Sequence, residues 1–394
     1  MTPATLAGSL FSDYEEFRLD HLRPSNCKHV IVIPELQQIV ARSKGLLKLQ
    51  ELGRSIEGRA INLVTGGRGA KRVLLWSQIH GDESTATLAL MDLFSFLDQR
   101  RDEKWVREML GSVTFSVIPM LNPDGAERVQ RYTAVNIDMN RDARTLATPE
   151  AGILRESQKK LSPAFGFNLH DQGLSSVGGT SAVTAISLLA PALDERRSSP
   201  SVRLRAMRLG AFVARILGKF AKGHIATYDD TYEPRAFGDN MQSWGTSTLL
   251  IESGHWPQDP EKMFIRKLNY VALLSSLWAI GNGCYQDVEM DHYSGLVSNG
   301  KRVYDIIIRG VTLRRGDGWS CPADIGLLLD PVQLASATKP DNLMDRRFVL
   351  KEIGDLRDFG ALRTIEGHGR PIASTSVVIE KSSPLSDLLD MLQL

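Results

Sequence analysis

Short apolar runs alternate along most of the chain with longer runs that have helical spacing. Strands are predicted at residues 46–52, 60–64, 72–79, 113–119, 165–169, 182–189 and 246–251. Helices are predicted at residues 34–45, 84–100, 149–161, 199–219 and 260–280. Because strands that alternate with helices build layered α/β folds, we expect a mixed central sheet flanked by helices.

The pattern changes after residue 283, where the apolar segments become short and rich in β-branched residues, which favour strands. These segments are residues 303–309, 311–313, 325–329 and 376–380. We therefore predict an N-terminal arm with a helix at residues 1–44, an α/β domain at 45–283 and a smaller β-rich C-terminal domain at 284–394. The last part contains no recognisable set of catalytic residues.

The composition, with 42% hydrophobic and 24% charged residues in a chain of 394, is typical of a globular protein. A formal net charge of +1 provides no overall attraction to nucleic acid or to an anionic membrane. No apolar run approaches the ~20 residues that span a bilayer, and the N-terminus lacks a signal-peptide pattern. We expect a cytoplasmic protein without nucleic-acid or membrane partners, and the oligomeric state stays open.

Side chains that can bind a metal or transfer a proton lie at the ends of three predicted strands. His80 and Glu83 follow the strand at 72–79, His170 follows the strand at 165–169, and Glu252 follows the strand at 246–251. In open α/β sheets, ligands gather beyond the carboxyl ends of the strands. One metal ion can reach both His80 and Glu83, and an imidazole with a carboxylate suits zinc. Each residue taken alone is equally compatible with a structural role.

A loop rich in polar residues lies between the strand at 113–119 and the helix at 149–161. It begins with the turn sequence Asn122-Pro123-Asp124-Gly125. Arg131, Asp138, Asn140 and Arg141 follow. Arginines in such a loop are either solvated surface groups or a grip for a carboxylate, which a guanidinium matches with two hydrogen bonds.

Taken in order, these motifs resemble those of the zinc carboxypeptidase (metallocarboxypeptidase, M14) family, and the resemblance covers about residues 45–280. The loop Gly53-x-Ser55-x-Glu57-Gly58-Arg59 is also typical of that family. The resemblance implies a Zn²⁺ ion held by His80, Glu83 and His170, with Asp138 orienting His80. It also implies that Glu252 is the general base, that Arg131 stabilises the oxyanion, and that Asn140 and Arg141 bind the substrate's terminal carboxylate.

The activity implied is zinc-dependent hydrolysis of the C-terminal peptide bond of a peptide by a metal-activated water. One alternative is a zinc-dependent amide hydrolase of N-acyl amino acids, which resembles the aspartoacylase and succinylglutamate desuccinylase group. Either enzyme would act on a substrate that carries a carboxylate. The other alternative is a non-catalytic binding protein on the same scaffold.

The sequence departs from the family pattern at three places. Many members carry a tyrosine that caps the substrate about twenty residues before the general base; here Tyr228 and Tyr232 lie near that place, and we slightly favour Tyr232. Asp171 follows the third predicted zinc ligand where a small polar residue is usual. The segment from Phe237 to Asp239 is also unfamiliar. These departures concern substrate specificity more than the type of reaction.

Overall fold

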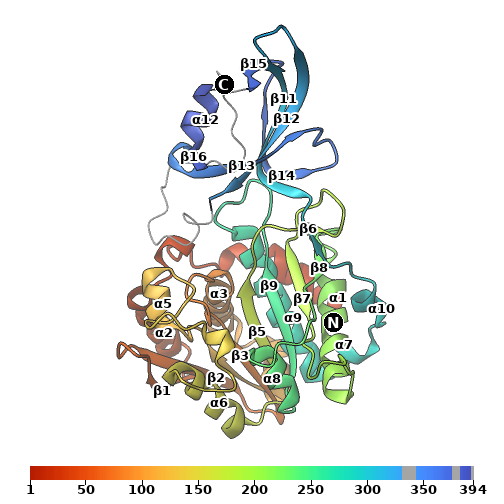
Figure 1. The fold of residues 1–394 in the computed structure, drawn as a ribbon. Coiled ribbons are helices and arrows are strands. Elements are labelled where there is room, and N and C mark those ends of the chain that lie inside the picture. Colours follow the sequence, from red (N-terminus) through yellow and green to blue (C-terminus); the bar gives the residue numbers. More distant parts are fainter. Residues whose placement is uncertain (331–342, 375–381, 392–394) are drawn as a thin grey trace.

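The central sheet of the computed structural model, which describes residues 1–330, 343–374 and 382–391, has eight strands (Figure 1). In spatial order they are β1 (Leu47–Arg54), β2 (Ala60–Gly67), β4 (Val113–Ile118), β3 (Lys71–Trp76), β5 (Phe165–Asp171), β9 (Ser247–Ser253), β7 (Ile186–Leu189) and β8 (Ile225–Thr227). Neighbouring strands from β4 to β9 are parallel, whereas β1–β2, β2–β4 and β7–β9 are antiparallel. The predicted mixed sheet is confirmed.

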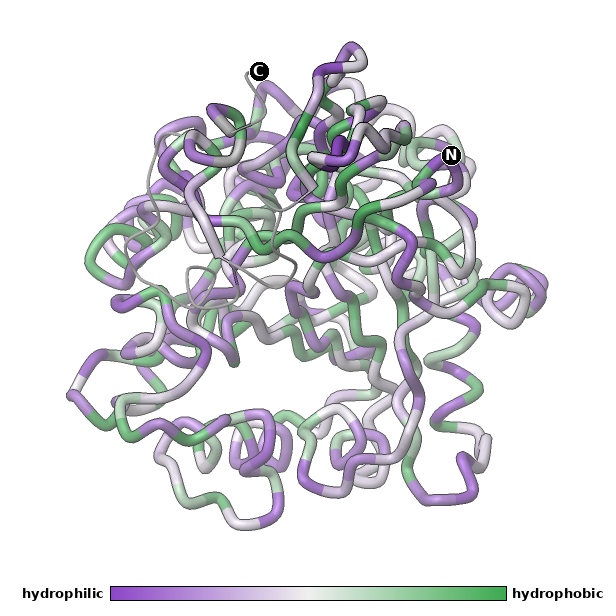
Figure 2. Tube along the Cα trace, turned by 45° about the horizontal axis from the view of Figure 1, so that its top comes forward, coloured by the Kyte–Doolittle hydropathy of each residue, from purple (hydrophilic) through white to green (hydrophobic). Residues whose placement is uncertain are grey.

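Helices cover both faces of this sheet. Successive side chains of a strand point to opposite faces, so Val73 and Leu75 enter one core and Leu74 and Trp76 the other. The first core includes α1 (Pro3–Ser12), α2 (His29–Arg42), α3 (Thr85–Arg100), α4 (Lys104–Ser112), α7 (Ser201–Leu217) and α9 (Met263–Asn282). The second includes α6 (Pro149–Leu161) and α8 (Phe237–Ser243). Figure 2 shows apolar stretches in the centre of the molecule and hydrophilic stretches in many peripheral loops.

Most predicted elements are present, with shifted ends. The predicted helix at 149–161 coincides with α6, whereas the predicted strand at 182–189 is reduced to β7. The Asn122 turn opens a short helix, α5 (Pro123–Arg128), which the Asn122 side chain caps. Helix α4 was not predicted. Within the described residues, no helix is both long and apolar enough to cross a membrane.

The C-terminal part forms a second sheet above the large domain (Figure 1). Its strands, in spatial order, are β14 (Gly360–Glu366), β11 (Val303–Arg314), β12 (Ser320–Leu329), β13 (Arg347–Gly354) and β16 (Ser382–Pro384), and β15 (Pro371–Ala373) pairs with β11. Helix α12 (Leu385–Met391) packs with it. The predicted strands at 303–309 and 311–313 are one strand, because the chain forms a β-bulge rather than a break between Ile308 and Val311. The predicted strand at 376–380 lies outside the described residues.

A connecting segment ties the two parts together. It contains η4 (Cys284–Asp287), α10 (Asp291–Ser294) and β10 (Asn299–Gly300), which pairs with β6 (Ser176–Val177). Tyr293 is buried in the first core of the large domain, and its hydroxyl accepts a hydrogen bond of 2.7 Å from the Ala190 amide. The second sheet therefore begins at Val303, some residues after the predicted boundary at 284.

The N-terminal arm is part of the large domain, and a buried ion pair holds it there. Arg266 in α9 donates to both carboxylate oxygens of Asp92 in α3 at 2.6 and 2.5 Å, and neither residue is more than 1% exposed. The Tyr14 hydroxyl and the Leu19 amide donate to the same carboxylate, and Arg266 also donates to the Leu22 carbonyl. The ion pair thus joins the arm to two helices.

We expect Asp92→Ala to lower the free energy of unfolding by about 3–5 kcal/mol, because it leaves the buried guanidinium of Arg266 without its counter-charge. Urea-induced unfolding measures the loss. The control is Arg23→Ala, which breaks an exposed ion pair with Glu261 and should cost less than about 1 kcal/mol. Equal losses in the two variants would contradict a structural role for the buried pair.

Candidate metal centre

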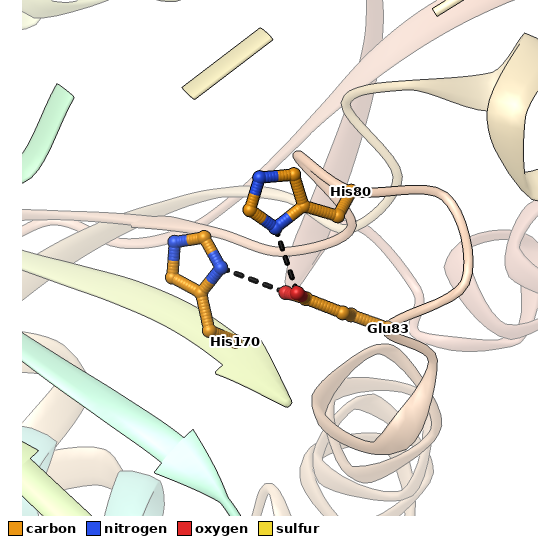
Figure 3. A group of neighbouring side chains, drawn as sticks. All are labelled: His80, Glu83 and His170. Atoms are coloured by element: carbon orange, nitrogen blue, oxygen red, sulfur yellow. Dashed lines mark hydrogen bonds and ion pairs between the residues drawn. The ribbon is translucent and has the colours of Figure 1, made fainter. Parts of the chain in front are cut away.

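Three predicted metal ligands, from two separate parts of the chain, converge at the carboxyl edge of the central sheet (Figure 3). His80 follows β3, Glu83 precedes α3, and His170 lies in β5. The Nδ1 atoms of His80 and His170 each lie 2.7 Å from a different carboxylate oxygen of Glu83. The ligand atoms all lie within 4.8 Å of one another, and all three side chains are buried. The arrangement is a compact nitrogen and oxygen donor set.

The donor set fits a zinc ion. Two imidazoles and one glutamate are a known ligand combination for catalytic zinc, which keeps one further position open. The Nε2 atom of His80 lies 3.1 Å from Asp138 Oδ1, so the other ring nitrogen, Nδ1, faces the centre. A carboxylate partner of this kind fixes the orientation of a metal-binding histidine. Asp138 therefore lies where the resemblance places it.

Close packing of two loops positions His80. A Cβ atom on Gly81 would lie 2.1 Å from the carbonyl carbon of Gly125, so only glycine fits at this crossing. The Gly81 amide donates to the Arg131 carbonyl at 3.4 Å, and the Asn122 side chain donates to the Ile79 carbonyl at 3.5 Å. The turn after Asn122 thus supports the backbone on both sides of the metal-binding loop.

The glycine-rich loop between β1 and β2 is held by the same turn. The buried Asp124 carboxylate accepts hydrogen bonds from the Ser55 hydroxyl at 2.7 Å, the Glu57 amide at 3.0 Å and Arg59 Nη1 at 2.7 Å. These contacts explain the motif in which Ser55, Gly58 and Arg59 recur at fixed spacing. They serve the fold and contact no predicted metal ligand.

Arg131 reaches the centre, and its guanidinium is partly exposed. It donates to Asp138 Oδ2 at 3.0 Å through Nη2, and its Nη1 lies 3.4 Å from Glu83 Oε1. Because Asp138 also contacts His80, one carboxylate orients both a metal ligand and a cationic donor. The guanidinium is thus available to a negatively charged group beside the metal ligands.

Asn140 and Arg141 lie in η3 (Met139–Arg141), directly after Asp138. The Asn140 side-chain oxygen accepts a hydrogen bond of 3.1 Å from the Phe237 amide, which ties this loop to the start of α8. Arg141 is partly exposed, and its Nε lies 3.5 Å from Glu233, which also pairs with Arg235. A substrate carboxylate would therefore compete with Glu233 for Arg141, a feature that the sequence analysis did not foresee.

Glu252 lies directly beside His170, because these two residues are paired in the parallel register of β5 and β9. Its side chain is only 7% exposed, and within the described residues its Oε2 atom has no hydrogen-bond partner. Burial raises the pKa of Glu252, and the negative charges of Glu83 and Asp171 raise it further. A carboxylate in this environment has a strong tendency to take up a proton.

Asp171, the unusual residue after His170, is neutralised by contacts that the sequence did not reveal. Its Oδ2 atom accepts from the Thr85 hydroxyl at 2.5 Å and from Lys262 Nζ at 3.2 Å. Lys262 also donates to the Ser253 carbonyl at 3.2 Å. The ion pair therefore joins the residues that follow His170 and Glu252.

The capping tyrosine remains a prediction, with Tyr228 and Tyr232 as its candidates. The pKa of Tyr228 is raised by burial and then by the negative charges of Glu252 and Glu83. These influences place Tyr228 within reach of the field of the centre, although 39% of its surface is exposed. Tyr228 directly follows β8, a short strand whose position depends on tertiary pairing with β7.

Charge is concentrated in the centre when no cation is present. Burial alone would lower the pKa of His80, but the carboxylates of Glu83 and Asp138 raise it to about 9. Burial likewise disfavours the charged form of Glu83, but the two imidazoles outweigh it and lower the pKa of that carboxyl. A cation bound between these ligands would compensate the same carboxylate charge.

Part of the chain is similar to known proteins. The zinc carboxypeptidase family matches residues 32–170, which include all three predicted metal ligands but not Glu252. Carboxypeptidase 2 of Trichophyton rubrum is 29% identical over 143 residues, 34% of this chain and 26% of that protein. The probable carboxypeptidase 2 of Arthroderma benhamiae is 32% identical over 100 residues, 25% of this chain and 19% of that protein. The chain thus spans about a quarter or less of the length of these curated relatives.

Solved structures share the fold. A metallo-carboxypeptidase from Burkholderia cenocepacia superposes with a TM-score of 0.51 at 17% identity, over 63% of this chain and 68% of that one. A putative carboxypeptidase from Burkholderia mallei gives a TM-score of 0.50 at 17% identity, over 62% and 67% of the two chains. Residues 32–170 are thus similar to the zinc carboxypeptidase family, and the chain shares its fold with these solved structures.

We expect the purified protein to bind about one zinc ion per chain and His170→Ala to lose most of it, because two ligands hold zinc far more weakly than three. Metal analysis after dialysis measures the stoichiometry. The matched control is His292→Ala, at an exposed position in α10. Equal zinc contents in the two variants would remove His170 from the ligand set.

The carboxyl of Asp239 in α8 should make stability depend on pH. Burial raises its pKa from an ordinary 3.8 to about 6, although its Oδ1 accepts a hydrogen bond from the Glu233 amide. Because the unfolded chain ionises first, the wild type loses stability as pH rises from about 4 to 6. Relative to wild type, Asp239→Asn should therefore gain roughly 1–3 kcal/mol between pH 4 and pH 7. Urea unfolding at both pH values measures this difference; a constant difference would contradict the raised pKa.

Proposed function

We propose that this protein is a zinc-dependent carboxypeptidase that hydrolyses the C-terminal peptide bond of a peptide substrate. The observation that carries the proposal is the convergence of His80, Glu83 and His170, with the unpartnered Glu252 carboxylate next to His170 in the register of the sheet. The family of the matched segment supports the same reaction class. We include in this proposal the activity of the whole protein and the cytoplasmic location that the sequence predicts.

The ligand set would hold zinc, which supplies a Lewis acid for the scissile carbonyl and a water of lowered pKa. Glu252 would take the proton of the attacking water and deliver it to the departing amine. Burial and the nearby carboxylates raise the pKa of Glu252, which supports a role in proton transfer. Its burial excludes competing solvent from this transfer.

The arginines would provide the complementary charges. Arg131, held in place by Asp138, would donate to the oxyanion that develops on the scissile carbonyl. Arg141, supported by Asn140, would bind the terminal carboxylate once that group has displaced Glu233. Recognition of a terminal carboxylate restricts cleavage to the last peptide bond. Tyr228, or the Tyr232 that we favoured from the sequence, would close over the bound substrate.

Zinc-loaded protein should release the last residue from peptides with a free C-terminus and leave C-terminally amidated peptides intact. Liquid chromatography with mass spectrometry, on a peptide library with every residue type at the last position, measures the products. Release of acetate or succinate from N-acyl amino acids without peptide cleavage would show that the deacylase alternative is correct. No turnover of either class by zinc-loaded protein would favour a binding function.

Glu252→Gln should retain zinc yet lose at least about a hundredfold in kcat, because glutamine cannot take up the proton of the attacking water. The control is Glu150→Gln, which alters another buried glutamate, in α6, whose carboxylate accepts from the Ile56 amide. Metal analysis and turnover are measured on both variants. Unchanged turnover in Glu252→Gln would remove Glu252 from its proposed role.

A further inference from the structure

The segment that leads into the C-terminal sheet pairs with β6, in the loop that follows β5. We call residues 297–302 the strap. Its backbone accepts hydrogen bonds of 2.9 Å from Thr227 and from Gly178, at the Val297 and Ser298 carbonyls respectively. The Arg302 amide donates to the Ser176 hydroxyl at 3.0 Å. The strap therefore pairs with the loop that follows β5 and with the end of β8.

One side chain of the strap connects the residue that follows β5, the strand of His170, with β7, the strand that pairs with the strand of Glu252. Asn299 donates through Nδ2 to Gln172 Oε1 at 2.7 Å and accepts at Oδ1 from the Ser187 hydroxyl at 2.9 Å. Gln172 lies two residues after His170. Ser187 in β7 is fully buried and lies opposite Glu252 in the register of β7 and β9. A single amide thus bridges the surroundings of a metal ligand and of the proposed base.

The strap also connects to the predicted substrate cap. Thr227, which donates to the Val297 carbonyl, immediately precedes Tyr228. The position of Tyr228 is fixed further by its own amide, which donates to the Leu188 carbonyl at 3.1 Å. Residues 297–299 therefore contact the segment after the ligand His170, the strand β7 that pairs with the strand of the base, and the residue before Tyr228.

The C-terminal sheet anchors this arrangement from the other side. The Gln258 amide donates to the Leu362 carbonyl in β14 at 3.3 Å. A Cβ atom on Gly360 would lie 2.0 Å from the Ser181 carbonyl oxygen, so β14 packs directly against the loop after β5. The strap is thus held at both ends, by α10 packed on the large domain and by β11 in the second sheet. Its geometry depends on both domains.

We propose that Asn299 is a positioning residue that sets the alignment of His170 and Glu252, and that the C-terminal domain is thereby part of the catalytic unit. The expected effect of Asn299 on kcat rests on the proposed function. The expected effect on the geometry of the metal ligands does not depend on that function. Residues that hold metal ligands through hydrogen bonds typically change affinity or activity 10- to 100-fold when removed. Asn299 lies one contact further from the metal ligand and the base, because it acts on them through Gln172 and Ser187.

The test is Asn299→Ala in the full-length protein. We expect kcat to fall about tenfold with KM within twofold, because substrate groups do not contact Asn299. The matched control is Asn26→Ala, which removes an asparagine that also bridges two backbone sites, the Arg23 amide and the His21 carbonyl. That control should lose similar stability and keep kcat. An unchanged kcat in folded, zinc-loaded Asn299→Ala would overturn the proposal.

A spectroscopic measurement separates this inference from the proposed function. Cobalt(II)-substituted protein should show a shifted visible absorption band in Asn299→Ala and an unshifted band in Asn26→Ala, whether or not peptides are cleaved. An unshifted band in Asn299→Ala would overturn the positioning of His170. Absence of peptide cleavage by the wild type would overturn the proposed function alone.

A double-mutant cycle checks the route through Ser187. Ser187→Ala removes one arm of the bridge, and its effect on kcat should be smaller than that of Asn299→Ala. The double variant should be no slower than Asn299→Ala, because both substitutions break the same contact. Multiplied effects in the double variant would show that the two residues act independently and would overturn the bridge. If Asn299→Ala does not fold, the Ser187→Ala variant by itself still tests the proposal.

Discussion

The parallel pairing of β3, β5 and β9 is the constraint on which the whole centre depends. Parallel strands end at the same edge of a sheet, so residues separated by more than eighty positions meet there. The register then places His170 directly opposite Glu252. A shift of one residue would turn one of these side chains to the other face of the sheet. The tight crossing of Gly81 and Gly125 completes the arrangement by bringing in His80.

This edge of the sheet carries an unusual density of buried charge. Glu83 and Glu252 are buried there and Asp171 is half-buried, and only Asp171 has a lysine partner in the part of the chain described. Buried carboxylates are costly unless they are paired or bind a cation. The two imidazoles satisfy Glu83 but leave Glu252 without a partner. The site is therefore arranged for a divalent ion and for a carboxylate that readily accepts a proton.

The C-terminal sheet gives the molecule a feature beyond the shared scaffold. Solved relatives superpose on only about three fifths of the chain. The connecting segment nonetheless contacts the loop after β5 and the strands that flank Glu252. A domain that looks like an appendage in the order of the sequence is thus attached at the centre of the large domain. Its attachment gives the C-terminal part a physical route to the proposed reaction.

The sequence by itself determined the fold class, the alternation of most strands and helices, and the candidate ligands, because strand-end position and spacing are local properties. It also located Asp138 and Glu252, whose motifs stand next to recognisable strands and loops. Only the tertiary structure decided that Glu233 pairs with Arg141, that Lys262 pairs with Asp171, and that Asn299 bridges the Gln172 and Ser187 side chains. Each of these contacts joins residues whose separation in the sequence follows no fixed spacing. Packing and strand register determine such contacts, so no local sequence pattern predicts them.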